Sequence, residues 1–212
     1  ITAVSSNTSV ATCSLNGNTI TVTSKGKGSA KITISIATTD DYLGASCQLS
    51  VTVILVVGYH GTVSLSGSSR SGSAAASTGN YAIFAGGYTG TMQSNNSVWY
   101  TYYNTVDAFN TSLTLSSPTP LSTARGRMGA GTVGDYAVFA GGMLGSRGGD
   151  ASALVEAYNS SLTKKSAPNL PHHPTEAPAA ASIKKEIIIF AGGYVVDDDV
   201  YGPTNAGVAY DA

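Results

Sequence analysis

The sequence predicts an all-β protein, and three observations lead to that fold class. The 212 residues include 25 glycines and are rich in Thr, Val, Ile and Tyr, which favours strands joined by tight turns. The first fifty residues alternate between apolar and polar side chains, as half-buried strands do. An eight-residue phrase also occurs three times, as NYAIFAGG at 80–87, DYAVFAGG at 135–142 and EIIIFAGG at 186–193.

The low charge content and the short apolar runs exclude two classes of partner. Charged residues make up 11% of the chain, against roughly 25% in an average soluble domain. The net charge is −1 and the two basic clusters are small, so we expect no nucleic-acid partner, which would need a basic face. The longest apolar run begins at Val53 and is shorter than the about 20 residues of a membrane span, so we expect no membrane insertion. Low charge and two cysteines favour an extracellular protein of a virion or a bacterial cell surface.

Residues 1–54 are the first predicted domain. Apolar side chains fall on one face of each expected strand, and polar Thr, Ser and Lys fill the other. The sequence LNGN at 15–18 predicts a hairpin turn, because Asn-Gly readily adopts positive φ angles. Cys13 and Cys47 share the inward parity of their strands, so we expect a structural role, either as a buried thiol pair or as a disulfide between sheets.

This region resembles the group 2 bacterial immunoglobulin-like domain. The matching residues are SSNTSVATCSLNGNTITVTSKGKGSAKITISI, followed by the terminal strand ASCQLSVTVI. The resemblance implies a partial β-sandwich whose first strands would precede Ile1. We therefore expect either a segment of a longer chain or a sandwich completed by another polypeptide.

The rest of the sequence repeats with a period near 50 residues. Besides the eight-residue phrase, TVDAFNTSLT at 105–114 returns as LVEAYNSSLT at 154–163 and begins again as GVAYDA at 207–212. A period of this length indicates a repeat architecture. Each copy predicts a strand buried on both faces and then a glycine pair where the backbone passes close to its neighbours. The structural residues so predicted are Gly86, Gly87, Gly141, Gly142, Gly192 and Gly193, with Arg70 and Arg125 ten residues before the first two phrases.

Residues 63–212 resemble the kelch repeat, and 55–62 would be a linker. The resemblance rests on the IFAGG and VFAGG phrases, on Phe109 and Tyr158 in the following strand, and on Arg70 and Arg125. It implies a β-propeller of which about three blades are present, whereas closed propellers typically have four to eight. We expect a segment of a longer chain; the alternative is that several chains contribute blades to one ring.

No catalytic signature is present, so we expect a protein that is not an enzyme and has no cofactor. The adjacent His172 and His173 fall in a Pro-rich link, and neighbours in a strand point to opposite sides, which disfavours a shared metal. The acidic cluster in VVDDDVYG at 195–202 could offer carboxylates to Ca²⁺, but its spacing favours a solvated loop. The sequence therefore predicts no metal site.

Three inserts of different sequence follow the glycine pairs, at 88–105, 143–154 and 194–206. Inserts at equivalent places in a repeat protein emerge on one face and often carry binding function. The first insert is aromatic, which suits a sugar or a protein hot spot, although alternate residues could instead pack into the blade. The predicted ligand-binding residues are Tyr88, Trp99, Tyr100, Tyr102, Tyr103, Arg147, Asp197, Asp198 and Asp199.

The combination of both resemblances is similar to surface proteins of Gram-positive bacteria and to phage appendage proteins. It implies a virion or cell-surface recognition protein, such as a fibre or tail component or an adhesin. Its partners would be a cell-surface glycan or protein and other chains of the same fibre or virion. Two alternatives stay open: a propeller oxidase or sugar isomerase whose catalytic residues lie in further blades, and a purely architectural fibre module.

Overall fold

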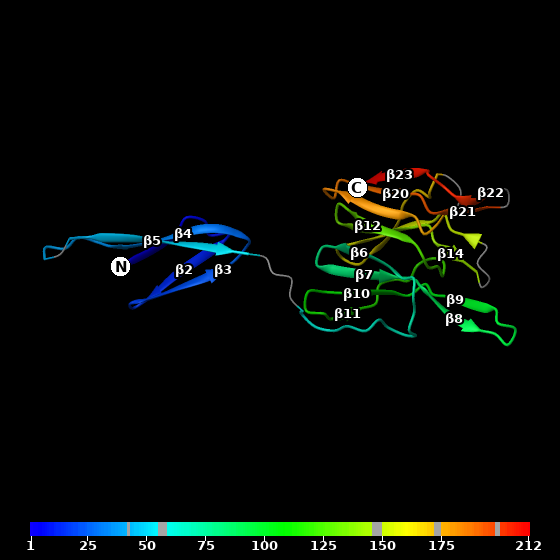
Figure 1. Ribbon diagram of the computed structural model, residues 1–212, viewed down its shortest axis with the longest axis horizontal. Coiled ribbons are helices and arrows are strands. Elements are labelled where there is room, and N and C mark those ends of the chain that lie inside the picture. The colour runs from blue at the N-terminus through cyan, green and yellow to red at the C-terminus, as the bar shows by residue number, and fades with distance from the viewer. Residues whose placement is uncertain (42, 55–58, 146–149, 172–174, 198–199) are drawn as a thin grey trace. The chain divides into compact units, whose positions relative to one another are not determined.

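The computed structural model describes residues 1–41, 43–54, 59–145, 150–171, 175–197 and 200–212 (Figure 1). The all-β prediction is confirmed: the described residues form antiparallel strands and include no helix, hence none that could cross a membrane. Contacts between residues divide the chain into two units, Ile1–His60 and Gly61–Ala212, which are described separately. Four residues of the expected linker, 55–58, lie outside the described residues.

The N-terminal unit consists of a three-stranded sheet and a hairpin. The sheet has the order β1-β4-β5, and the hairpin β2-β3 turns at Gly17, where φ is 57°. The strands are β1 (Thr2–Ser5), β2 (Ala11–Asn16), β3 (Thr19–Ser24), β4 (Gly28–Ile36) and β5 (Ala45–Val53). The Asn-Gly turn that the sequence predicts thus joins the two hairpin strands, with Asn16 opposite Thr19.

The two cysteines correct an expectation. Both are free thiols, and Cys13 is half-buried while Cys47 is exposed, so they form neither a buried pair nor a disulfide. The buried core of this unit centres on Val10, Ala11 and Ala30 and is extended by partly buried valines. Cys47 lies opposite Ile34 in a part of β5 whose residues are all exposed, so strand parity alone did not predict burial there.

The C-terminal unit contains three repeats built from antiparallel strands in the same order. The first repeat has β6 (Ala74–Thr78), β7 (Tyr81–Ala85), β10 (Val106–Phe109) and β11 (Leu115–Ser116). The second has β12 (Gly129–Val133), β13 (Tyr136–Ala140), β16 (Val155–Asn159) and β17 (Lys164–Ser166). The third has β19 (Ala179–Ile183), β20 (Ile187–Ala191) and β23 (Gly207–Asp211). In each repeat the eight-residue phrase supplies the second strand, β7, β13 or β20.

A short ribbon follows the glycine pair of every repeat. The ribbons are β8 (Tyr88–Met92) with β9 (Val98–Tyr102), β14 (Met143–Leu144) with β15 (Asp150–Ala151), and β21 (Tyr194–Asp197) with β22 (Val200–Pro203). The strand β18 (Thr175–Glu176) also pairs with β21. Figure 1 shows these ribbons on the same side of the repeats. The inserts that differ most in sequence therefore share one side of the C-terminal unit.

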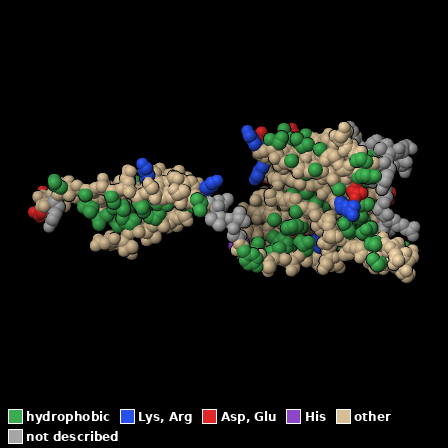
Figure 2. All heavy atoms as spheres, viewed as in Figure 1, with side chains coloured by type: hydrophobic (Ala, Val, Ile, Leu, Met, Phe, Trp, Pro, Cys, Tyr) green, Lys and Arg blue, Asp and Glu red, His purple; other side chains and the backbone are tan. Residues whose placement is uncertain are grey.

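Two apolar cores hold the repeats together. One packs the first repeat on the second and includes Ile83, Phe139 and Tyr158. The other packs the second repeat on the third and includes Val138 and Ile188. The second repeat is therefore covered on both faces, and four of the five residues of β13 are buried. Figure 2 shows that the visible surface consists mostly of uncharged polar side chains and backbone, as the low charge content predicts.

Hydroxyl groups connect the first strands of the three repeats. The hydroxyl of Thr132 on β12 donates to the Ser77 carbonyl of β6 at 2.6 Å. The backbone N–H of Thr132 donates to the Ser182 hydroxyl of β19 at 3.1 Å. These three residues occupy the same position in their strands, and a hydrogen bond between a hydroxyl and a main-chain group links each repeat to the next there, with different donors at the two contacts.

The first glycine of each pair lies where successive repeats meet. Gly86 and Gly141 have φ angles of 63° and 69°, which L-residues with a side chain rarely adopt. A methyl group at Gly86 would collide with the carbonyl oxygen of Arg125, and one at Gly141 would lie 2.5 Å from the carbonyl oxygen of Thr175. The glycine therefore allows the backbone of the next repeat to pass at contact distance.

Candidate functional site

The ribbon β8–β9 carries most of the predicted aromatic residues, and its register sorts them onto two faces. Tyr88 is opposite Tyr102, Gly90 is opposite Tyr100, and Thr91 is opposite Trp99. Side chains alternate between the faces of a strand. We call the side with Tyr88, Tyr100, Tyr102, Met92 and Val98 the tyrosine face, and the side with Thr89, Thr91, Trp99 and Thr101 the tryptophan face.

The rings of the tyrosine face contact one another. Tyr88 and Tyr100 pack edge to face with ring centroids 5.3 Å apart, and Tyr88 and Tyr102 are tilted at 5.6 Å. Edge-to-face contacts of this kind stabilise aromatic pairs beyond the area that they bury. All three rings are half-buried, and Met92 beside them is 72% exposed. The tyrosine face thus combines fixed rings with accessible apolar surface.

Arg127 fixes the base of this face from the second repeat. Its guanidinium carbon lies 5.3 Å from the centroid of the Tyr88 ring, and Nη2 is 3.4 Å from the Tyr88 hydroxyl. Nη1 donates to the Glu176 carboxylate at 2.6 Å. The hydrogen bond from Arg127 lowers the pKa of Tyr88, and the bonds to Tyr88 and Glu176 raise the pKa of Arg127 above its usual value. A cation, a ring and a carboxylate therefore form one connected group across the three repeats.

Tyr102 anchors the ribbon at the same place. Its hydroxyl lies 3.6 Å from the sulfur of Met143, the first residue of the second ribbon. Burial raises the pKa of Tyr102, so its hydroxyl stays protonated at neutral pH. Tyr102 and one side of Tyr88 therefore pack against the repeats, as the alternative interpretation of the aromatic insert expects. Tyr100 extends the tyrosine face away from these contacts.

Local hydrogen bonds define the tip of the ribbon. The side-chain oxygen of Asn95 accepts from the backbone N–H of Ser97 at 3.1 Å and from its hydroxyl at 2.6 Å. Asn96 has a φ of 61°, a conformation that Asn tolerates better than most residues. The Asn-rich insert therefore forms an ordered turn that holds β8 and β9 in register.

The other predicted ligand-binding residues are not gathered at the tyrosine face. Trp99 is 47% exposed on the tryptophan face, and the Tyr103 hydroxyl lies 3.1 Å from the Thr89 hydroxyl. Asp197 ends β21, far along the chain from the aromatic ribbon. The remaining three, Arg147, Asp198 and Asp199, lie outside the described residues.

Sequence reasoning did not identify Arg127, Met143 or Glu176 as part of this site. They come from the second and third repeats, and their contact with the ribbon depends on how the repeats stack. One feature of the sequence does distinguish Arg127. It lies two residues after the repeated arginine, where the first repeat has Gly72, so a charged residue replaces glycine at this position.

The repeated arginines are buried and belong to the interior. Arg70 donates from Nη2 to Asp107 at 2.5 Å, from Nη1 to the Ser66 carbonyl at 2.7 Å and from Nε to the Gly86 carbonyl at 2.9 Å. The side chains of Arg70 and Asp107 are 1% and 0% exposed. Ser66 completes the arrangement by donating its N–H and its hydroxyl to Asp107.

The second repeat repeats this arrangement with a glutamate. Arg125 donates to Glu156 at 2.9 Å and to the Leu154 carbonyl, while Ser122 donates its N–H and hydroxyl to Glu156. Burial disfavours the charged carboxylate, but these donors outweigh it and lower the pKa of Glu156. The Nε of Arg125 has no hydrogen-bond partner among the described residues. Both ion pairs are internal supports rather than accessible catalytic groups.

Within the described part of the chain, no three His, Cys, Asp or Glu side chains come together as a metal site would require. His172 and His173 lie outside that part, and so do two of the three aspartates of the acidic cluster at 197–199. The tyrosine face combines ring hydroxyls, one cation and exposed apolar atoms.

Comparison with known proteins bears on the fold. No protein-family model matches the sequence, and no curated protein sequence is similar to it. Among solved structures, that of YjhT, a β-propeller-like protein, is similar with a TM-score of 0.53 and 13% identity. The match covers 68% of this chain and 43% of YjhT, so this chain spans less than half of that structure. The kelch and immunoglobulin-like resemblances stay predictions, and at this identity the likeness supports an all-β, propeller-like fold.

Proposed function

We propose that this chain is a non-enzymatic recognition protein of a virion or bacterial cell surface, and that the ribbon β8–β9 binds a surface glycan or protein. Other chains of the same fibre or virion would be its assembly partners. The observation that carries the proposal is the tyrosine face, in which Tyr100 extends an ordered set of rings next to exposed Met92.

The order of these rings supports a binding role. Tyrosine has few rotatable bonds and offers an apolar ring with a polar tip, so it gives contact area at a small cost in conformational entropy. Here Tyr88 is also held by Arg127 on one side and by Tyr100 on the other. A ligand would meet a surface that is already arranged, which favours affinity.

The composition of both faces suits a neutral, hydroxyl-rich ligand. The tyrosine face offers ring edges and hydroxyls, and the tryptophan face places Trp99 among three threonines. Sugar rings present apolar C–H faces and hydroxyl groups, which match aromatic rings bordered by polar side chains. A protein hot spot rich in Tyr and Trp would meet the same chemistry.

A binding assay on whole bacterial cells and on purified wall glycans tests the proposal. Because the ribbon has two faces, Tyr100→Ala and Trp99→Ala are compared separately, with Thr101→Ala as the control on a strand residue without a ring. We expect Tyr100→Ala to weaken binding at least tenfold and Thr101→Ala to leave it within about twofold, since aromatic anchors often contribute 2 kcal/mol or more.

Each outcome of that assay has a distinct meaning. Loss with Trp99→Ala alone would move the site to the tryptophan face. Loss on cells but not on glycans would favour a protein ligand. Unchanged binding by a folded Tyr100→Ala and Trp99→Ala double variant would remove the ribbon from consideration.

A further inference from the structure

The third repeat departs from the other two at the three positions of the buried ion pair. The serine that binds the carboxylate, Ser66 or Ser122, is replaced by Pro171. The arginine is replaced by Thr175, whose carbonyl accepts from the Gly142 N–H as the Arg125 carbonyl accepts from the Gly87 N–H, and the acid is replaced by Val208. All three members of the arrangement change together, so the third repeat cannot form the internal ion pair.

Backbone hydrogen bonds show which positions of the three repeats are equivalent in space. The first glycine of each pair donates its N–H to the residue before the third strand: Gly86 to Thr105, Gly141 to Leu154 and Gly192 to Ala206. The second glycines accept from Tyr103, Ser152 and Thr204 in the same way. The environment that surrounds the guanidinium in the first two repeats therefore has a direct counterpart in the third.

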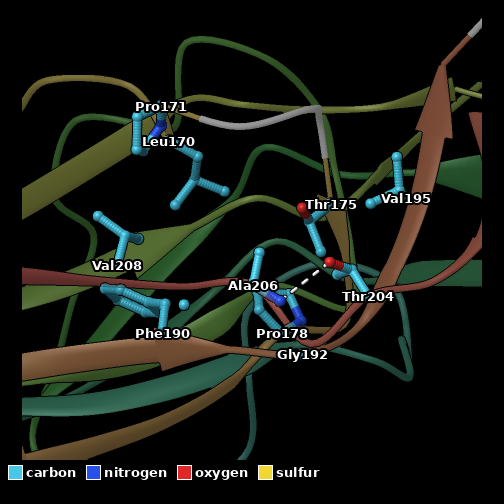
Figure 3. Close-up of a pocket in the computed structure, with 11 residues that line it drawn as sticks. Leu170, Pro171, Thr175, Pro178, Phe190, Gly192, Val195, Thr204, Ala206 and Val208 are labelled. Atoms are coloured by element: carbon cyan, nitrogen blue, oxygen red, sulfur yellow. Dashed lines mark hydrogen bonds between the residues drawn. The ribbon is translucent and has the colours of Figure 1, made fainter.

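That counterpart is a cavity. We call it the vacated slot, and its volume is about 130 Å³. In Figure 3, Leu170, Phe190 and Val208 lie on one side of it, and Thr175, Val195 and Thr204 lie on the other. Gly192, Pro171 and Val208, which also line it, correspond to the groups that contact the guanidinium of Arg70: Gly86, Ser66 and Asp107.

Thr175 does not fill the slot that its arginine counterparts occupy, because its side chain is much shorter than that of arginine. The next residue, Glu176, places its carboxylate 2.6 Å from Arg127, at the base of the tyrosine face. The empty slot and the ion pair between the second and third repeats thus belong to adjacent residues of the third repeat.

We propose that the vacated slot is a binding site for a small neutral apolar molecule, of the size of one aromatic ring or a branched alkyl group. The volume is close to that of an engineered apolar cavity of about 150 Å³ that binds benzene. Six lining side chains are apolar, from Leu170, Pro171, Pro178, Phe190, Val195 and Val208, besides Ala206.

The chemistry of the lining selects against a charged ligand. Among the described residues that line it, none has a charged side chain, and the polar side chains are the hydroxyls of Thr175 and Thr204. The Thr204 hydroxyl accepts from the Ala206 N–H at 3.0 Å. Moving a cation from water into such a site without a paired acid is unfavourable. A guanidinium ion, the group that the first and second repeats hold at this position, is therefore the negative control, and we expect it not to bind.

Benzene and guanidinium are titrated separately into the full chain, and binding is followed by NMR of the methyl groups of Leu170, Val195 and Val208. We expect saturable shifts of these methyls with benzene and none with guanidinium at concentrations that leave the fold intact. Two variants remove the cavity by different means. Val208→Phe fills it with a larger side chain, and Thr175→Arg with Val208→Asp restores the ion pair.

The matched control for the double variant is Thr111→Arg with Ile183→Asp, which introduces the same two charges at exposed positions. We expect benzene shifts to vanish in both slot variants and to persist in the control. Absence of saturable shifts in the folded wild-type chain would overturn the proposal. So would benzene binding that survives Val208→Phe, or guanidinium binding in place of benzene.

Discussion

In the second repeat the side chain of Arg125 is fully buried and paired with Glu156, whereas in the third repeat Thr175 occupies the same position and the neighbouring Glu176 pairs outward with Arg127. The strand order and the backbone hydrogen bonds around this position are the same in both repeats. The fold therefore does not require the ion pair. What it requires is either a complete set of charge partners or the removal of all of them.

The largest effect should come from removing one partner in the second repeat. Glu156→Leu leaves the guanidinium of Arg125 buried without a carboxylate, and breaking a buried pair in this way costs about 3–5 kcal/mol. Urea unfolding followed by near-ultraviolet circular dichroism of the tyrosines measures this loss. In the third repeat, Val208→Ala should cost on the order of 1 kcal/mol, because only apolar contacts are removed.

The double variant Arg125→Met with Glu156→Leu sharpens the same test. It imitates the third repeat by removing both charges, and such replacements are often neutral or stabilising. We expect it to be more stable than Glu156→Leu alone. A double variant as unstable as the single one would mean that the second repeat needs the ion pair for packing.

A second contrast concerns the glycine pairs. Gly141→Ala should cost about 2 kcal/mol or more, because the methyl group meets the Thr175 carbonyl in addition to the unfavourable φ. At Gly192, the methyl group would lie 3.7 Å from the nearest atom, the Thr204 carbonyl oxygen, so only the φ penalty of about 1 kcal/mol remains. The same unfolding measurement compares the two variants, and equal losses would contradict the role of the glycine in stacking.

Acid should affect the second repeat through Glu156. Its folded-state pKa is lowered, so the unfolded chain binds the proton more tightly. The contribution of the ionised Glu156 carboxylate to the free energy of unfolding is therefore fully present above the ordinary pKa of 4.5, and it is lost as the pH falls through the folded-state pKa. We expect stability to fall more steeply with acidification in the wild type than in Glu156→Gln. Parallel pH profiles would show that the glutamate is not the titrating group.

The smallest effect belongs to the outward pair. Arg127 is 40% exposed, so Arg127→Ala should cost about 0.5 kcal/mol of folding free energy. Its local effect is more specific: the hydrogen bond that lowers the pKa of Tyr88 is removed, so that pKa should rise toward 10.0. A spectroscopic tyrosine titration, with Lys165→Ala as a remote control, measures the change. No shift would separate Arg127 from the tyrosine face.

The secondary structure of the repeats could be predicted from the sequence, because each copy contains the residues that specify its own strand and turn. The phrase DYAVFAGG combines an apolar strand with a glycine pair, and both parts can be read without knowledge of the neighbouring repeat. The all-β fold class followed from the same signals. Burial of Cys47 could not be predicted in this way, because parity fixes the side of a strand but not whether another layer covers it.

The candidate site was predictable only in part for a similar reason. The aromatic insert is contiguous in sequence, so Tyr88, Tyr100 and Tyr102 could be selected together. The separation of Trp99 from Tyr100 follows from strand register, which the sequence had left open. Arg127 and Glu176 reach the ribbon through stacking of different repeats, and such long-range contacts leave little trace in a single sequence.

The hydroxyl bonds between Ser77, Thr132 and Ser182 have a consequence for how such a chain can change over generations. They use only small side chains and main-chain groups, and they lie at the same strand position on both sides of the second repeat. A duplicated segment of about fifty residues would bring its own half of the joint with it. Whole repeats can therefore be gained, lost or exchanged by recombination without redesign of their neighbours, while each inserted ribbon diverges independently.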